Sequence, residues 1–370
     1  MPELDIRRKY TYGRKKKGRR KENFAASLVS GLLPWFGDTV SDVVRKIVFL
    51  ASLIALAVSV LVIANFYLGP KEEGTSAFDW VVDHSLDDRV RISISADKGG
   101  DLSGGGETKE VEILEKYLEF YEINNDFVGY VSIDPYINYP VAQSGDNEYY
   151  LYHNFRKVPT ENGTVFADYE GVFTPTSRPH NTILYGHNLI TKNLFQPLVN
   201  YRDKFEFLKN NPVVNFDTLY EKGTYKIFSV FLSNTKDYHG EVFKYWNYVY
   251  FHSKSEFYDF VTECLDRSYY QTGTDIKYGD EFLTLSTCDF SAFDGLRLVI
   301  VARRVREGEP PFVDTERFFD NKGFDENGKY KRKMFDVYYT VFNSGKGWAG
   351  RNWDVSLVEG LKEYLSEKEG

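Results

Sequence analysis

Residues 281–305 read EFLTLSTCDFSAFDGLRLVIVARRV, and this stretch decides the fold. Two apolar runs rich in β-branched residues, which pack well on pleated surfaces, flank the short turn-like run DFSAFDG. The pattern predicts two adjacent antiparallel strands joined by a tight connection. Because Cys288 ends the first run and Arg297 begins the second, we expect these two residues to lie close together.

Similar short runs occur through the preceding half of the chain, separated by Gly, Pro, Asn and Asp turns. About eight strands at this spacing predict a mainly β fold, either a closed barrel or a sandwich. The other predicted strands are FVGYVSI (127–133), YPVAQ (139–143), EYYLYHNF (148–155), GTVFADY (163–169), NTILYGH (181–187) and GTYKIFSVFLS (223–233).

Two segments have the period of a helix instead. Apolar residues recur at helical spacing over Lys109–Asp126, which predicts an amphipathic helix before the first strand. A second helix is predicted from Ser253 to Tyr270, between late strands, because Ser253 and Glu256 form a capping-box pattern. Cys264 falls on the apolar face of this helix, so we interpret it as a small core residue.

The N-terminal part of the chain differs in charge from the remainder. Residues 1–46 carry a net charge of +7 and the following residues −15. From Ile47 to Pro70 no residue is charged, and this run is long enough to cross a bilayer. We therefore predict a transmembrane helix at 47–69, with the basic tail on the cytoplasmic side. The alternative, a cleaved signal peptide, would have a shorter apolar run and a shorter preceding segment.

This topology explains the basic tail at residues 1–46 as an orientation signal in contact with anionic lipid, in preference to a nucleic-acid-binding segment. Residues 70–107 are predicted to form an extracytoplasmic stalk that ends in the Gly/Ser-rich linker DKGGDLSGGGE. A catalytic domain is predicted at 108–306 and an extension of unknown role at 307–370. Within the extension, VSLVEGLKEYLSE (355–367) predicts a helix and DNKGFDENGK (320–329) predicts turns.

The residue types available for chemistry are few. Only two cysteines occur, so a disulfide-rich scaffold is excluded, although pairing of Cys264 with Cys288 stays possible. Gly-rich phosphate loops and HExxH zinc helices are absent, and no cofactor or metal is expected. Acyl transfer by a thiol needs a cysteine, a proton shuttle and a positive group for the developing oxyanion. Cys288, His187 and Arg297, each at a predicted strand end, form one consistent set.

Three segments around these residues resemble the signature segments of sortases. They are NTILYGHN (181–188), TLSTC (284–288) and RLVIVARR (297–304), in the family's order of His, Cys and Arg. The resemblance covers residues 108–306. Class B is most similar, on the basis of the helix before the first strand, the YPVAQ and NEYYLYHNF segments, and the helix between late strands.

The resemblance implies a sortase β-barrel that acts on a sorting signal near the C-terminus of secreted proteins. Cys288 would attack the carbonyl after a Thr in that signal and form a thioester, while His187 protonates the departing amine. An amine on a cell-wall precursor or a pilin would then resolve the thioester. Arg297 would stabilise the oxyanion. The implied partners are these secreted proteins, the amine acceptor and membrane lipid through one helix, with no nucleic acid.

Four neighbouring residues are weaker candidates for substrate contact: Ser286, Thr287, Asp289 and Asn188. Alternation along the strand makes one of Ser286 and Thr287 face the core. Asp289 could tune His187 or Arg297, or form a turn. Asn188 could orient the imidazole or cap the following turn. The other histidines are interpreted as structural: His84, His153, His180, His239 and His252.

Two other functions remain open from the sequence. A papain-type thiol hydrolase needs the same residue types but usually places Cys before His in the chain. A non-enzymatic anchored scaffold would have Cys288 buried or bonded to Cys264. Within the sortase hypothesis, the sequence leaves wall anchoring and pilin polymerisation both open.

Overall fold

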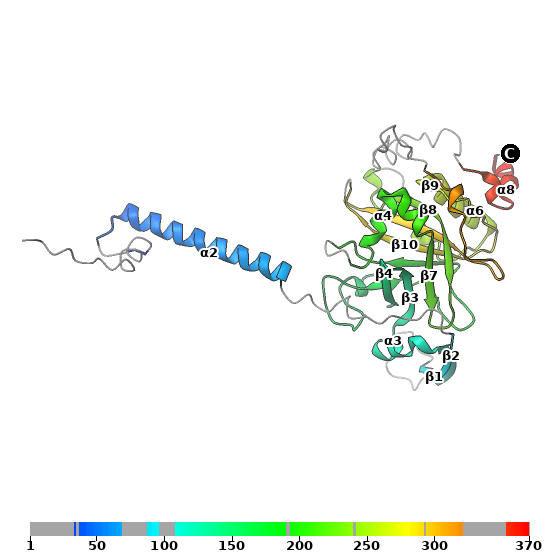
Figure 1. Cartoon of the computed structure of the whole chain (residues 1–370), viewed down its shortest axis with the longest axis horizontal. Helices are drawn as coiled ribbons and strands as arrows, with labels where there is room; N and C mark the ends of the chain where they lie inside the picture. Colours follow the sequence, from blue (N-terminus) through cyan, green and yellow to red (C-terminus); the bar gives the residue numbers. More distant parts are fainter. Residues whose placement is uncertain are drawn as a thin grey trace, which may run out of the picture. The chain divides into compact units, whose positions relative to one another are not determined.

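The computed structural model describes residues 33–34, 37–68, 87–95, 108–189, 193–239, 242–291, 294–320 and 353–369. The chain divides into two compact units, Met1–Glu72 and Glu73–Gly370 (Figure 1). The basic run at 7–21, His84, the linker at 97–107 and the predicted turns at 321–329 lie outside the described residues.

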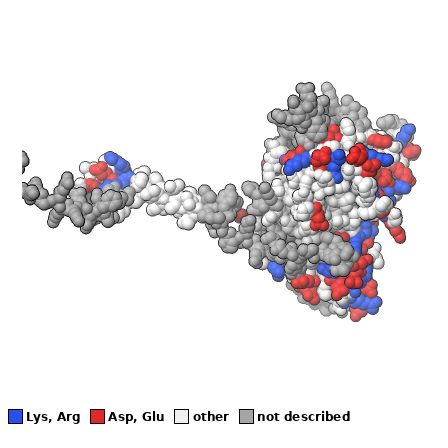
Figure 2. All heavy atoms as spheres, in the orientation of Figure 1, with Lys and Arg blue, Asp and Glu red and all other residues white. Residues whose placement is uncertain are grey.

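The first unit contains one long helix, α2 (Val40–Leu68). Thr39 caps it, because its hydroxyl accepts a hydrogen bond from the backbone N–H of Asp42 at 3.3 Å. The stretch Val40–Leu61 has a mean hydropathy of 2.2 and is long and apolar enough to cross a membrane. Its visible surface is uncharged beyond the first turns (Figure 2). The hydroxyls of Ser52 and Ser59 each donate to a backbone carbonyl one turn earlier. Both serine hydroxyls in the uncharged part of this stretch therefore have a hydrogen-bond partner within the helix.

The second unit is built on a closed barrel of eight strands, as the sequence predicted. The order around the barrel is β10-β11-β8-β7-β3-β4-β5-β6, with β4–β5 and β6–β10 parallel and the other neighbours antiparallel. The strands are β3 (Phe127–Ile133), β4 (Ile137–Ala142), β5 (Val165–Ala167), β6 (Asn181–Tyr185), β7 (Val213–Thr218), β8 (Thr224–Asn234), β10 (Phe282–Asp289) and β11 (Leu296–Arg304).

Side-chain alternation divides the core between two faces of the barrel wall. Leu283 and Leu285 of β10 belong to a cluster with residues from every barrel strand, which is the barrel interior. Phe282 of β10 and Val299 of β11 belong instead to a second cluster with α6 (Lys254–Arg267), on the outside. Odd-numbered residues of β10 therefore point inward and even-numbered residues outward.

The predicted helix from Ser253 is confirmed. The Ser253 hydroxyl accepts from the Glu256 N–H at 3.1 Å, and Cys264 is fully buried, as expected. The carboxylate of Glu256 accepts a hydrogen bond from the backbone N–H of His252 at 2.7 Å. A capping box would use the N–H of the next residue, Ser253, instead.

One predicted strand is wrong and another was missed. Residues 148–155 form the short 3-10 helix η2 (Tyr149–Leu151) followed by turns. The Asp146 carboxylate accepts hydrogen bonds from the N–H groups of Glu148 and Tyr149, which turns the chain there. The missed strand, β7, pairs with β3 and β8, so the barrel still has eight strands.

The helix predicted over Lys109–Asp126 is wrong in its first half. Thr108–Leu114 is the strand β2, paired antiparallel with β1 (Arg89–Ser95), and only the second half is helical, as η1 (Glu115–Tyr117) and α3 (Leu118–Ile123). Val111 and Ile113 also alternate with glutamates, so the segment fits a period of two once a partner strand is present. β1 lies in the region predicted as stalk, so folded structure begins before residue 108.

Shorter elements complete the unit. Between β6 and β7 lie η3 (Gln196–Leu198), α4 (Val199–Asp203) and α5 (Phe205–Asn210), and between β8 and β10 lie η4 (Asp237–His239), η5 (Tyr245–Asn247), α6 and β9 (Tyr270–Gln271). After β11 come η6 (Thr315–Arg317), β12 (Phe319–Asp320), η7 (Val355–Leu357) and α8 (Leu361–Glu369). The helix predicted at 355–367 is thus a 3-10 turn followed by a helix that begins after Gly360.

Candidate active site

The candidate site lies on the outer face of the barrel, at one end of the β10–β11 pair. Cys288 of β10 and Arg297 of β11 are directly opposite each other in the antiparallel register. Opposed residues have Cβ atoms about 4.5–5.5 Å apart, and both side chains point outward. Each is half-buried. The predicted proximity of this thiol and this guanidinium therefore follows from the strand register.

His187 extends the neighbouring strand on the other side of Cys288. β6 runs parallel to β10, and its last paired residue, Tyr185, is opposite Ser286. His187 and Cys288 each lie two residues farther along. Gly186 continues the pairing, because its N–H donates to the Ser286 carbonyl at 3.3 Å and its carbonyl accepts from the Thr287 hydroxyl at 2.7 Å. Three distant segments thus bring His187, Cys288 and Arg297 to one end of the barrel wall.

The imidazole of His187 is oriented by a backbone group that the sequence did not indicate. Its Nε2 lies 3.0 Å from the carbonyl oxygen of Leu151 in η2. Since a carbonyl can only accept, Nε2 carries the proton in this contact. Nδ1 is then the nitrogen that can exchange a proton with a substrate. The turn-forming run SGDN at 144–147 was the available signal for η2.

A second unpredicted contributor is Tyr245 of η5. Its hydroxyl is 2.7 Å from the hydroxyl of Ser286, two residues before Cys288 on the same outer face. Tyr245 is fully buried, and burial raises the pKa of its phenol to about 12, with opposing contributions from Ser286 and Arg297. The phenol is therefore neutral at neutral pH and acts as a hydrogen-bonding group beside the thiol.

Tyr185 also lies on the outer face, at the end of β6. Its hydroxyl donates to the Asp168 carboxylate at 2.8 Å, and the same oxygen accepts from the Asn147 amide at 2.9 Å. Burial and the Asp168 charge raise the pKa of Tyr185 well above its usual range. This contact fixes the wall of the site next to His187.

The four weaker candidates divide between the two faces. Ser286 is on the outer face but buried beneath Tyr245. Thr287 and Asp289 point inward. The Asp289 carboxylate, which has no exposed surface, forms an ion pair with Arg202 of α4 and accepts from the Ser291 N–H at 2.9 Å. Its contacts are those of a turn former and not those of a partner of His187 or Arg297.

Asn188 links the loop after β6 to the backbone of Cys288. Its side-chain amide donates to the Cys288 carbonyl at 2.9 Å. This hydrogen bond therefore holds the strand end that carries Cys288 next to the loop that carries His187.

The two cysteines are in different settings, and both are free thiols. Cys264 is fully buried in α6, and burial raises the pKa of its thiol well above the ordinary value. Cys288 is partly exposed. Two of the remaining histidines have structural contacts: His153 Nδ1 donates to the Tyr149 carbonyl at 2.8 Å, and His180 Nδ1 accepts from the Phe251 N–H at 2.9 Å.

Within the described ranges of the chain, no group of three or more His, Cys, Asp or Glu side chains could hold a metal ion.

Comparison with known proteins identifies the kind of barrel. The model of the sortase domain family matches residues 133–305. Sortase B of Listeria monocytogenes serovar 1/2a (strain ATCC BAA-679 / EGD-e) is 31% identical over 196 residues, which cover 52% of this chain and 76% of the relative. Sortase B of Staphylococcus aureus (strain NCTC 8325 / PS 47) is 28% identical over 199 residues, covering 53% and 74%. A solved structure of sortase B from Bacillus anthracis has 31% identity and a TM-score of 0.45, covering 52% of this chain and 85% of that one.

Proposed function

Because this chain belongs to the sortase family, with class B members among its relatives, we propose that it is a membrane-anchored cysteine transpeptidase. In this proposal Cys288 is the nucleophile, His187 the acid and base, and Arg297 the oxyanion-stabilising group. The observation that carries the proposal is the direct opposition of Cys288 and Arg297 on β10 and β11, next to the end of the strand that leads to His187.

The proposed reaction has two acyl-transfer steps. The Cys288 thiolate attacks the carbonyl after a Thr in a C-terminal sorting signal, the C–N bond breaks, and His187 gives a proton to the departing amine. The thioester is then attacked by an amine on a cell-wall precursor or a pilin, the C–S bond breaks, and His187 takes a proton from the incoming amine. The guanidinium of Arg297 stays charged at any working pH, which suits stabilisation of the negative oxygen in both steps.

We propose that the chain spans the membrane once through α2, with the N-terminus in the cytoplasm and the catalytic unit outside. The apolar stretch Val40–Leu61 supports the anchor, and the basic residues before it support the orientation. Labelling intact cells with a membrane-impermeant maleimide tests this. Modification of Cys288 without lysis supports the orientation, whereas modification only after lysis contradicts it.

The reaction is tested with the full chain in detergent micelles, incubated with a library of short peptides that contain Thr before the scissile bond and with an amine acceptor. Mass spectrometry should find peptide–amine products that disappear in His187→Ala and Cys288→Ala. Products of hydrolysis alone would favour a thiol protease. No turnover on any peptide would favour the scaffold.

A further inference from the structure

The C-terminal extension, described at residues 307–320 and 353–369, lies beyond the part of the chain that the sortase family model matches. We infer that this extension is a brace for the β8–β10 insertion (residues 235–281), and that it thereby holds Tyr245 against the strand that carries Cys288. The inference rests on the proposed function, since it concerns the same site.

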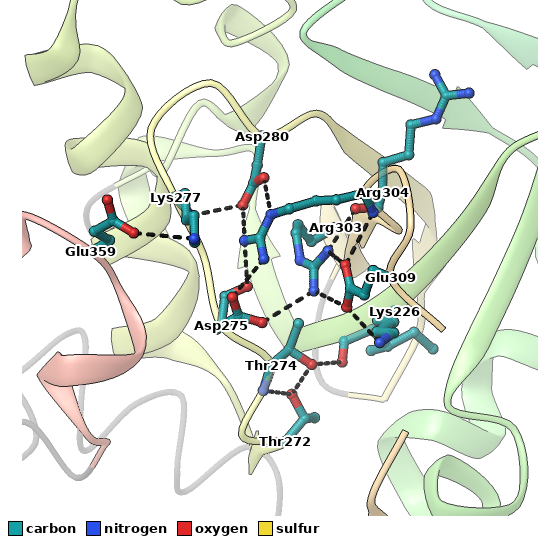
Figure 3. A network of polar contacts seen from close by, with 12 residues as sticks. Lys226, Thr272, Thr274, Asp275, Lys277, Asp280, Arg303, Arg304, Glu309 and Glu359 are labelled. Carbon is teal, nitrogen blue, oxygen red and sulfur yellow. Dashed lines mark hydrogen bonds and ion pairs between the residues drawn. The ribbon is translucent and has the colours of Figure 1, made fainter. Parts of the chain in front are cut away.

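The first anchor of the brace is Glu309, shortly after β11. Its carboxylate is 2.5 Å from Lys226 Nζ of β8 and 2.8 Å from Arg303 Nη2 of β11 (Figure 3). The Arg303 guanidinium also reaches Asp275, in the loop between β9 and β10, at 3.3 Å. The start of the extension is therefore tied to two barrel strands and to the end of the insertion.

The chain then packs against the barrel-interior cluster and joins the insertion directly. Phe318 is buried in the barrel-interior cluster together with Tyr270. In the next two residues, β12 pairs antiparallel with β9, with Phe319 opposite Gln271 and Asp320 opposite Tyr270. Because β9 follows α6 almost immediately, this pairing fixes the C-terminal end of α6.

The second anchor is the segment from Trp353 onward, which packs on α6 itself (Figure 1). The indole N–H of Trp353 donates to Asp266 at 2.7 Å. Val358 and Leu361 are buried in the outer cluster with the apolar face of α6. The segment also binds the β9–β10 loop, since the Ile276 N–H donates to the Leu357 carbonyl at 2.7 Å.

Two further contacts and one glycine fix the register of this segment. The Tyr258 hydroxyl of α6 donates to the Glu359 carbonyl at 2.9 Å, and the Glu359 carboxylate lies 3.4 Å from Lys277 (Figure 3). Gly360 has φ +77°, and a Cβ there would approach the Tyr258 hydroxyl to 2.6 Å. Only glycine allows the chain to turn this closely against α6.

From α6 the packing continues to the site. The ring of Phe260 in α6 lies 6.2 Å from that of Phe243 and 5.3 Å from that of Tyr248, measured between centroids. These two aromatic residues flank η5, where Tyr245 is hydrogen-bonded to Ser286. The extension contacts one side of α6, and the segment that carries Tyr245 contacts another. Loosening the first contact should therefore increase the mobility of the second.

The experiment compares the full chain with a chain that ends at Asn352, both in micelles. We expect faster amide hydrogen exchange across 243–250 in the shorter chain, with the barrel strands still protected. The KM for a Thr-containing peptide should rise about five- to tenfold while kcat changes less than about twofold, because Tyr245 binds the strand that carries Cys288 but does not react. Adding a synthetic peptide of residues 351–370 should reverse both changes.

Trp353→Phe keeps an aromatic side chain but removes the hydrogen bond to Asp266. This variant provides the test if the shorter chain does not fold. It should raise both the rate of amide hydrogen exchange across 243–250 and the KM, by smaller factors than in the shorter chain. Lys362→Ala, on the exposed side of α8, is the matched control and should change neither.

Unchanged exchange at 243–250 in both Trp353→Phe and the shorter chain would overturn the brace. An unchanged KM with a lowered melting temperature would overturn it too, because the extension would then act on stability alone. The exchange readout needs no turnover. If the full chain has no transpeptidase activity, the proposed function fails while the brace is still decided by exchange.

Discussion

The two ends of the β10–β11 pair present an arginine in opposite ways. At one end Arg297 is half-buried, donates to the carbonyl of the preceding residue at 3.1 Å, and forms no salt bridge to any described residue. At the other end Arg303 is fully buried, and Glu309 and Asp275 neutralise it. Both lie on the outer face of the same strand. What differs is whether the surrounding chain supplies carboxylates.

This difference separates a group available for chemistry from one that holds the fold. A guanidinium without a carboxylate partner can stabilise negative charge that develops on a substrate. The charge of a buried guanidinium that binds two carboxylates is already neutralised, so its removal weakens the network of ion pairs around it. We therefore expect substitutions at the Arg297 end to affect rate and those at the Arg303 end to affect stability.

The largest expected effect is at the Arg297 end, in Cys288→Ala. Transpeptidation measured by mass spectrometry should fall by at least about a thousandfold, because no other group can form the thioester. The melting temperature should hardly change. Cys264→Ala is the matched control: it should lower stability through the cavity left in α6 and keep activity at temperatures where it is folded. Activity that follows Cys264 instead of Cys288 would reverse the assignment.

At the other end, Arg303→Met should lower the free energy of unfolding by about 3 kcal/mol, since Glu309 and Asp275 lose hydrogen bonds to a buried charged group while they keep Lys226 and Arg306. Urea titration followed by tryptophan fluorescence measures this. The activity per folded molecule should stay within about twofold of the parent. A loss of less than about 1 kcal/mol would mean that the network does not hold the extension.

Arg297→Gln should show the converse. The kcat/KM should fall by about 10²–10³ while the free energy of unfolding changes by less than about 0.5 kcal/mol. Arg297→Lys, which keeps the charge but not the planar fork, should recover part of the rate. A large loss of stability in Arg297→Gln would show that this guanidinium also serves the fold.

The smallest expected effect is on acid stability at the Arg303 end. Hydrogen bonding to Arg303 holds the pKa of Glu309 well below its usual range, against the effect of burial. A depressed carboxyl pKa adds stability above the unfolded-state pKa of about 4.3, and this part is lost as the pH falls toward the folded-state value. The urea concentration at the midpoint of unfolding should therefore decrease as the pH is lowered below about 4. In Glu309→Gln this decrease should be smaller. A parallel drop in Glu309→Gln would assign it to other carboxyls.

Strand prediction from sequence succeeded where a local pattern was unambiguous. Seven of the predicted runs overlap barrel strands, including the two that end at His187 and Cys288 and the one that begins next to Arg297. It failed at 148–155, where five of eight residues are Tyr, Leu or Phe but a capped turn precedes them. It also failed at 108–114, where the apolar spacing fits two periods and only the pairing with β1 decides between them.

The candidate site was predictable in its residues but not in its supports. Cys288 and Arg297 are close because of a short connection, which the sequence reveals. Leu151 orients His187 through a backbone carbonyl, and a backbone carbonyl carries no residue-type signal. Tyr245 reaches Ser286 from an insertion packed on the barrel, 41 residues away in the chain. Such contacts depend on long-range packing.

The apolar span, the mainly β character, and the thiol, imidazole and guanidinium near strand ends can all be predicted from the amino-acid sequence, because each depends on short-range pattern and residue chemistry. Long-range contacts settle which arginine is neutralised, which nitrogen of His187 is held, and that the segment 353–369 packs on α6. The physical reason is that these outcomes depend on which distant groups meet, and burial and charge pairing are set only when the barrel closes.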